Sequence, residues 1–207
     1  KPEDTYRDSL VEDLRRRDFT VNAMAVGVPD HTFSDPFGGT RDLLAKVLRT
    51  PGAPEDSFND DPLRMMRAAR FSAQLGFDVD PGVFAATTSM ADRILKISAE
   101  RVRDELVKLL CSPDPRRGLA LLVDTGLAAL VLPELPALKL EIDEHHHHKD
   151  VYEHSLIVLE QAIDLEKERN PGAAPDLILR WAALLHDIGK PATKRIEPGG
   201  VVTFHHH

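Results

Sequence analysis

The sequence has too few cysteines for a disulfide framework and no apolar run long enough to span a membrane. Its 207 residues include one cysteine, Cys111, so no disulfide can form within the chain, and such a chain suits a reducing compartment. No apolar run approaches the roughly 20 residues that a membrane-spanning helix requires, and even the stretch 119–132 is interrupted by Asp124. These absences predict a cytoplasmic protein that is not inserted in a membrane.

The chain also lacks the excess of positive charge that is common among nucleic-acid-binding proteins. Its formal net charge is −8 at pH 7, which argues mildly against a surface covered with phosphate contacts. The arginines are nevertheless unevenly distributed, because they gather at 15–17, 64–70 and 101–103. A locally basic binding site on an acidic protein is therefore compatible with the sequence.

Neither end of the sequence has the features of a natural terminus. The chain begins at Lys1 without a methionine or an apolar signal segment, which predicts a fragment of a longer protein. Its last residues are His205, His206 and His207, and they are either native or the remnant of a tag.

The first part of the sequence predicts a small β portion. The run 19–28 is rich in β-forming residues, and a turn at Pro29 leads into a shorter run at 31–33, as in a hairpin. A short helix or turn is expected at 41–48, followed by a loop at 51–54 that contains two prolines and a glycine.

The remainder of the chain has a helical pattern, so the fold class is expected to be mostly α. Asp61 followed by Pro62 is typical of a helix start, and Gly76 is typical of a helix end. Further helices are expected at 81–95, 99–110, 115–125, 151–168 and 176–188, with a short one near 127 and an extended segment at 201–204.

An acid and three arginines recur at every third position of the segment 60–71, at Asp61, Arg64, Arg67 and Arg70. On one continuous helix this spacing makes Asp61 and Arg64 neighbours and places Arg70 nearly opposite Asp61, with Arg67 on the flank. We therefore expect that the four side chains do not share one flat site. Arg70 falls on the apolar side, so its stem is expected to pack in the core while its head pairs with an acid.

Asp61 and Arg64 together match the hydrogen-bonding edge that cytosine and adenine share. Each of these bases presents an amine donor beside a ring-nitrogen acceptor, while a carboxylate only accepts and a guanidinium only donates. Guanine and uracil present the opposite pattern, which would leave buried groups unsatisfied at a cost of about 1 to 3 kcal/mol each. The pair therefore predicts selection of C and A without a nucleic-acid template. The alternative for Asp61 is a helix cap alone.

Further segments carry a family resemblance. The run 16–24 reads Arg-Arg-Asp-Phe-Thr-Val-Asn-Ala-Met, and it is followed by Asp-Pro-Phe-Gly-Gly at 35–39 and Asp-Leu at 42–43. Together with 60–71, these segments resemble class II tRNA nucleotidyltransferases, which include CCA-adding enzymes and bacterial poly(A) polymerases. The resemblance implies the end of an α/β nucleotidyltransferase head followed by a helical neck.

The resemblance also implies which residues bind the nucleotide. Arg17 and Asp18 would contact its phosphate and ribose, and Asp61 with Arg64 would act as the protein template for the base. The family motif usually opens with Glu-Asp, so the shorter Asp60 leaves open how that position contributes. The remaining nucleotide-binding positions that the family implies are Asn22, Arg67 and Arg70.

The residues that would catalyse nucleotide transfer are not found where the family has them. In this family two Mg²⁺ ions are held by a DxD pair of carboxylates near a Gly-Gly phosphate loop, upstream of the motif at 16–24. The residues that precede this motif contain neither feature. We therefore expect parts of a nucleotide pocket but no transferase activity from this chain alone.

A second resemblance lies in the last third of the sequence. His186 and Asp187 are followed by Ile-Gly-Lys-Pro, a string that resembles the HD superfamily of metal-dependent phosphohydrolases. This implies that His154, His186 and Asp187 bind a divalent metal that activates water, with His207 as a further ligand by analogy. The alternative is an HD-like helical domain that binds no metal and supports the RNA. The histidines at 145–148 are interpreted as a solvated linker.

Taken together, the two resemblances predict three regions, with a head portion at 1–50, a neck at 51–135 and the start of an all-α HD domain at 136–207. The expected function is template-independent addition of C and A to the 3′ end of tRNA from CTP and ATP. The alternatives are a metal-dependent phosphohydrolase or phosphodiesterase, a poly(A) polymerase, and a non-catalytic RNA-binding fragment. Division of the work between CC-adding and A-adding enzymes also stays open.

Overall fold

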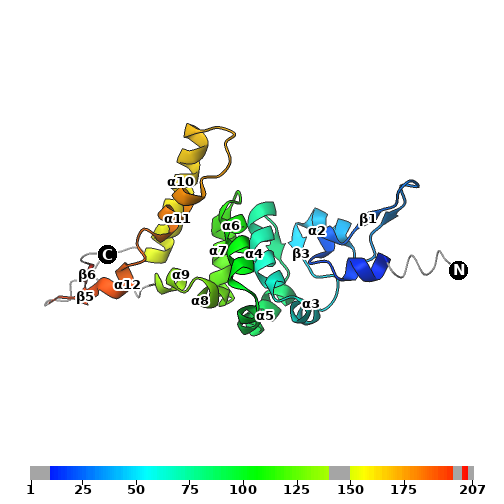
Figure 1. The fold of residues 1–207 in the computed structure, drawn as a ribbon, viewed down its shortest axis with the longest axis horizontal. Helices are drawn as coiled ribbons and strands as arrows, with labels where there is room; N and C mark the ends of the chain where they lie inside the picture. The colour runs from blue at the N-terminus through cyan, green and yellow to red at the C-terminus, as the bar shows by residue number, and fades with distance from the viewer. Residues whose placement is uncertain (1–9, 140–149, 198–201, 205–207) are drawn as a thin grey trace.

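The computed structural model describes residues 10–139, 150–197 and 202–204. Its elements follow one another in chain order along the long axis of the molecule, from the hairpin at 25–34 at one end to the strands at 194–196 and 202–204 at the other (Figure 1). One cluster of buried side chains runs through most of this length, from Phe19 to Leu184. The expectation of a mostly helical chain with a small β portion is confirmed.

The first segment forms the expected hairpin, although its strands are shorter than the pattern predicts. Strand β1 (Ala25–Val26) pairs antiparallel with β2 (Phe33–Ser34). The run expected to be extended from residue 19 instead begins with the 3-10 helix η1 (Thr20–Asn22), because the side chain of Asn22 accepts a hydrogen bond from the Phe19 amide at 3.0 Å. Helix α2 (Gly39–Ala45) and strand β3 (Val47–Leu48) follow, and β3 pairs in parallel with β4 (Asp78–Val79).

The loop expected at 51–54 ends at residue 53, and residues 54–60 form a helix that was not predicted from the sequence. Helix α3 (Pro54–Asp60) begins with proline in its first turn, where the missing amide hydrogen costs nothing. Asp61 then adopts an extended conformation, with φ −145° and ψ 99°, and α4 (Leu63–Leu75) begins after Pro62. Gly76 ends α4 in the left-handed conformation, as expected.

A group of helices then packs around α4. The expected helix at 81–95 is divided at Met90 into α5 (Pro81–Ser89) and the 3-10 helix η2 (Ala91–Lys96), whereas the expectation for 99–110 is confirmed by α6. Helix α4 packs against both α6 and the helix at 115–124 (Figure 1). The elements are α6 (Ala99–Leu110), α7 (Pro115–Asp124), α8 (Leu127–Val131) and α9 (Glu134–Ala137).

The last part of the chain contains two helices that lie side by side, α10 (Val151–Arg169) and α11 (Leu177–Leu185) (Figure 1). Helix α11 ends three residues earlier than expected, so His186 and Asp187 lie just beyond it. A short helix α12 (Lys190–Thr193) leads to the antiparallel strands β5 (Lys194–Ile196) and β6 (Val202–Phe204). None of the described helices is long and apolar enough to cross a membrane.

Candidate functional sites

Asp18 connects the first segment of the chain to the arginines of α4. Both of its carboxylate oxygens accept hydrogen bonds from Nη1 of Arg67, at 2.9 and 3.0 Å. The Nε atom of Arg64 lies 3.3 Å from the same carboxylate. Residues almost fifty positions apart in the sequence therefore form one cluster of charges.

Arg64 is held by backbone and side-chain oxygens from two directions. Its Nη1 donates to the carbonyl oxygen and the hydroxyl of Ser57 on α3, at 3.2 and 3.0 Å. Its Nη2 donates to the carbonyl oxygen of Arg16. The guanidinium is consequently fixed where α3, α4 and the first segment meet.

Asp61 lies beside these arginines but not on their helix. Because its backbone is extended, the expectation that one continuous helix carries both Asp61 and the three arginines is wrong. Its Oδ1 accepts a hydrogen bond from the Leu63 amide at 3.2 Å, so it does help to cap α4. Its Oδ2 accepts a hydrogen bond at 2.9 Å from Arg101, in the first turn of α6. The ion pair of Asp61 is thus made with α6.

Arg70 behaves as its position on the apolar side predicts. Its Nε donates to Oε2 of Glu105 at 2.6 Å and its Nη1 donates to Gln74 at 3.0 Å, while the guanidinium covers the ring of Phe71. Glu105 is 3% exposed and also lies 3.7 Å from Nε of Arg67. The expected pairing of the Arg70 head with an acid is confirmed.

The surroundings of Arg67 keep its guanidinium charged. Burial alone would lower its pKa, but the nearby carboxylates of Asp18, Glu105 and Asp61 outweigh this effect and raise the pKa above its usual value. A permanently charged arginine in this position suits a phosphate-bearing ligand.

Arg17 and Asn22 make their hydrogen bonds locally. Arg17 is exposed and donates to Asp13, four residues earlier, at 3.0 Å. Asn22 closes the 3-10 turn through the Phe19 amide. Of the first-segment residues expected to bind the nucleotide, the structure brings Asp18 to the arginines of α4.

Two members of this cluster, Arg101 and Glu105, were not predicted from the sequence as site residues. Their signal was their spacing, because residues four apart in the helix at 99–110 lie on one face. That face carries a positive charge followed by a negative one, which complements the acid and arginines between residues 61 and 70.

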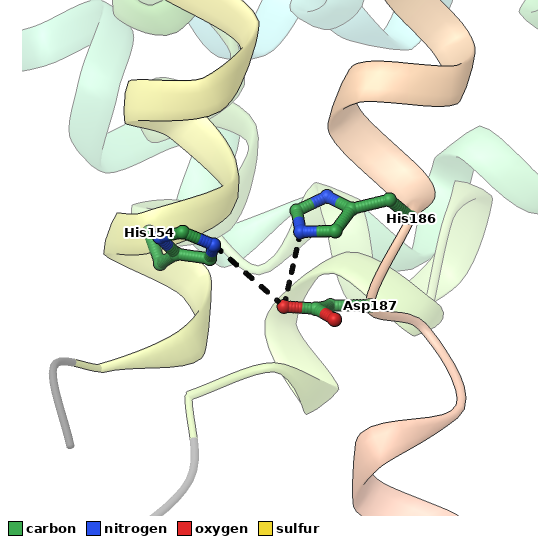
Figure 2. Close-up of side chains that lie close together, drawn as sticks. All are labelled: His154, His186 and Asp187. Atoms are coloured by element: carbon green, nitrogen blue, oxygen red, sulfur yellow. Dashed lines mark ion pairs between the residues drawn. The ribbon is translucent and has the colours of Figure 1, made fainter. Parts of the chain in front are cut away.

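A second candidate site lies between α10 and the end of α11 (Figure 2). Nε2 of His186 is 3.1 Å and Nε2 of His154 is 3.9 Å from Oδ2 of Asp187. Ligand atoms of the three residues lie within 4.8 Å of one another. The structure therefore brings together three of the four residues proposed as metal ligands, while His207 lies outside the described residues.

The donor set of this second site fits a divalent cation. Two imidazole nitrogens and one carboxylate oxygen are ordinary ligands of such ions. Nδ1 of His186 lies 2.9 Å from the carbonyl oxygen of Ala183, and a hydrogen bond there would place the proton on Nδ1 and leave Nε2 free to coordinate. Nζ of Lys190 is 2.7 Å from Oδ2 of Asp187, so a positive charge already lies beside the carboxylate.

Three family models match successive parts of the chain. Residues 1–49 match the poly A polymerase head domain, residues 76–138 match a model described as the probable RNA and SrmB-binding site of polymerase A, and residues 151–207 match the HD domain. The segment that holds Asp61 and the arginines of α4 falls between the first two matches.

Relatives with similar sequences are named as a tRNA nucleotidyltransferase and a CCA protein. The chain is 44% identical over 205 residues to an A-adding tRNA nucleotidyltransferase of Deinococcus radiodurans and 38% identical over 203 residues to a multifunctional CCA protein of an Azoarcus species. Each alignment covers 96% of this chain and 45% of the relative. The chain therefore spans about half the length of these curated relatives.

Solved structures show the same similarity. The CCA-adding enzyme of Bacillus stearothermophilus in complex with CTP is 34% identical, with a TM-score of 0.65 over 88% of this chain and 41% of that one. A complex of a CCA-adding enzyme with ATP gives a TM-score of 0.67 at 26% identity, over 88% of this chain and 41% of that one.

Proposed function

The chain belongs to the family of tRNA nucleotidyltransferases and poly(A) polymerases, and from that premise we propose that it selects the base in an enzyme that adds CCA to tRNA. The substrates are CTP, ATP and the 3′ end of tRNA. The chain contributes part of the head at 1–50, the neck at 51–135 and part of an HD domain at 136–207. By the family resemblance, Mg²⁺ would be held by a DxD pair of carboxylates, which is not found among the residues that precede the motif at 16–24.

The observation that carries this proposal is that Asp61, just before α4, and Arg64, in its first turn, are linked by a backbone hydrogen bond at 3.0 Å and that each side chain is held by other groups. Arg64 is held by Ser57 and Arg16, and Asp61 is held by Leu63 and Arg101. A fixed acceptor beside a fixed donor reads the shared edge of cytosine and adenine without a template. Arg67, held by Asp18, places a permanent positive charge near Asp61.

Base selection is tested in the full-length enzyme with four nucleoside triphosphates. We expect CTP and ATP to be incorporated into tRNA that lacks its CCA end, and GTP and UTP to be rejected. Asp61→Ala should lower the preference for C and A by about tenfold or more, as expected for one lost hydrogen-bonding group. Incorporation of all four nucleotides by the unaltered enzyme would overturn the proposal.

The choice of tRNA primer separates CCA addition from narrower activities. The unaltered enzyme should extend tRNA ending before CCA with C, and tRNA ending in CC with A. Extension of the CC-ending tRNA alone would overturn CCA addition in favour of A addition, the activity named for the Deinococcus radiodurans relative. Repeated addition of A would favour a poly(A) polymerase.

The cluster of His154, His186 and Asp187 supports a second function, hydrolysis of phosphate esters. A divalent ion bound there would supply an activated water. His154 and His186 would coordinate the ion through ring nitrogens. The nearly buried Asp187 would supply a negative charge, which Lys190 partly balances.

This second function is tested by metal content and by phosphate release. We expect the protein to retain a divalent ion after dialysis, and His186→Ala to abolish both ion retention and metal-dependent release of phosphate. His31→Asn, at an exposed histidine of the hairpin, is the matched control and should leave both unchanged. An unaltered protein that retains no ion would overturn hydrolysis at this site without affecting nucleotide addition.

A further inference from the structure

The carboxylate of Asp61 is held from two sides by groups of different origin. Its Oδ1 accepts from the Leu63 amide at 3.2 Å, within the first turn of α4. Its Oδ2 accepts from Nη2 of Arg101 at 2.9 Å, across the contact between α4 and α6. A carboxylate has about four acceptor positions, so further positions remain for a ligand.

We propose that Arg101 is a positioning residue for base selection, and that it fixes the direction in which Asp61 presents its free acceptor positions. This inference rests on the function proposed above for Asp61. Arg101 acts on the base through Asp61, and no contact between Arg101 and the nucleotide is required.

The conformation of Asp61 explains why such a residue is needed. Asp61 lies in an extended link between α3 and α4, and the last torsion of an aspartate side chain is only loosely restricted. One backbone hydrogen bond leaves the carboxylate free to rotate about that contact. A charge-assisted hydrogen bond from a planar guanidinium removes this freedom.

The ion pair of Asp61 and Arg101 is expected to affect base selection more than the stability of the fold. Arg101 is 48% exposed and Asp61 is 24% exposed at their side chains, and ion pairs between exposed residues contribute about 0 to 1 kcal/mol to folding. Hydrogen-bonding groups in binding sites, by contrast, strongly affect which substrate is accepted, because their direction decides which partner is left unsatisfied.

The rest of α6 supports the same role. Glu105 lies one helical turn after Arg101 and holds Arg70 at 2.6 Å and Arg67 at 3.7 Å. One face of α6 therefore fixes both the acid and two of the arginines at the nucleotide site. Arg101 fixes the base-reading carboxylate, and Glu105 fixes the positive charges beside it.

The test compares Arg101→Ala with Arg103→Ala in the full-length enzyme. Arg103 lies two residues away on α6 and pairs with its exposed neighbour Asp104, so it is the matched control. The quantity measured is kcat/KM for CTP and ATP relative to GTP and UTP, together with the urea midpoint of unfolding. Arg101→Ala should lower this preference about tenfold, a loss expected for a misdirected hydrogen-bonding group. Its urea midpoint of unfolding should stay close to that of Arg103→Ala.

Arg101→Lys provides a second variant that keeps the charge but loses the planar fork. It should restore part of the preference, with values between those of the alanine variant and the unaltered enzyme. An unchanged preference in Arg101→Ala and Arg101→Lys, with a selective unaltered enzyme, would overturn this inference alone. An unaltered enzyme without preference would instead overturn the proposed function and this inference with it.

Discussion

At the scale of single residues, the positions of the Arg67 and Arg70 side chains depend on the carboxylate of Glu105. It is almost fully buried, and its two carboxylate oxygens face different arginines. Removing one partner from a buried set of charges is costly, because the remaining charges lose their compensation while they stay away from water. Both arginines keep a second partner, Asp18 for Arg67 and Gln74 for Arg70.

Glu105→Gln should therefore destabilise the chain by about 3 kcal/mol, within the range for a broken buried ion pair. Glutamine keeps the size of the side chain, so the change removes the charge with little effect on packing. The free energy of unfolding is measured by urea denaturation. Asp104→Asn removes the neighbouring exposed carboxylate of α6 and should cost less than about 1 kcal/mol. Equal effects of the two substitutions would contradict the role of Glu105.

At the scale of secondary-structure elements, the close approach of α7 to α4 depends on Gly118. A Cβ atom at this position would lie 2.7 Å from the carbonyl oxygen of Ala69 on α4 and 3.0 Å from the side chain of Leu109 on α6. The backbone oxygen cannot move away without shifting α4, which carries Arg64 and Arg67. Gly118 thus sets the distance between α4 and its neighbours α6 and α7.

Gly118→Ala is expected to destabilise the chain by about 1 to 3 kcal/mol through overpacking. The gain of up to about 1 kcal/mol from replacing glycine within a helix offsets part of this cost. The measurement is the thermal unfolding midpoint by circular dichroism. Gly52→Ala is the control, because a Cβ at that position meets nothing within 4 Å. A Gly118→Ala variant as stable as the Gly52→Ala variant would show that α4 and α7 can separate without cost.

The elements show where reasoning from the sequence succeeds and where it stops. Helix α6 and the end of α4 at Gly76 were predictable, because capping residues and apolar spacing agree there. Helix α3 was missed because Pro54 was interpreted as part of a loop, although proline also begins helices. The helical wheel treated Asp61 as part of the same helix as the three arginines. The extended backbone of Asp61 shows that it precedes this helix.

The sequence predicted which residues belong to the candidate sites better than it predicted which residues contact one another. Asp61 and Arg64 were identified from hydrogen-bonding chemistry, but their partners Arg101 and Ser57 lie on other helices. The contact between Asp18 and Arg67 joins residues 49 positions apart, and a single sequence contains no direct record of such pairing. His154, His186 and Asp187 were identified by resemblance, and packing of α10 against α11 brings them together.

At the scale of the whole molecule, one buried arginine connects α10 and α11 to the helices around α4. Arg180 on α11 is 4% exposed. Its Nη1 donates to the carbonyl oxygens of Leu110 and Ser112 at the end of α6, at 2.8 and 2.9 Å. Its Nε and Nη2 lie 3.0 and 2.9 Å from Oε2 of Glu166 on α10. The guanidinium therefore satisfies carbonyl groups that a helix end leaves unpaired and connects three helices at once.

Arg180→Ala should weaken the attachment of α10 and α11 to the helices around α4 by about 3 to 5 kcal/mol, because Glu166 and the two carbonyl oxygens would lose their partner. Trp181, the single tryptophan of the chain, is the next residue on α11, so its fluorescence reports on this junction. We expect the fluorescence transition in urea to precede the loss of helix in circular dichroism, because α10 and α11 would separate before the helices around α4 unfold. Arg169→Ala, at the exposed end of α10, should leave the two transitions coincident. Coincident transitions in Arg180→Ala, at an unchanged urea concentration, would mean that the shared core alone holds the two parts together.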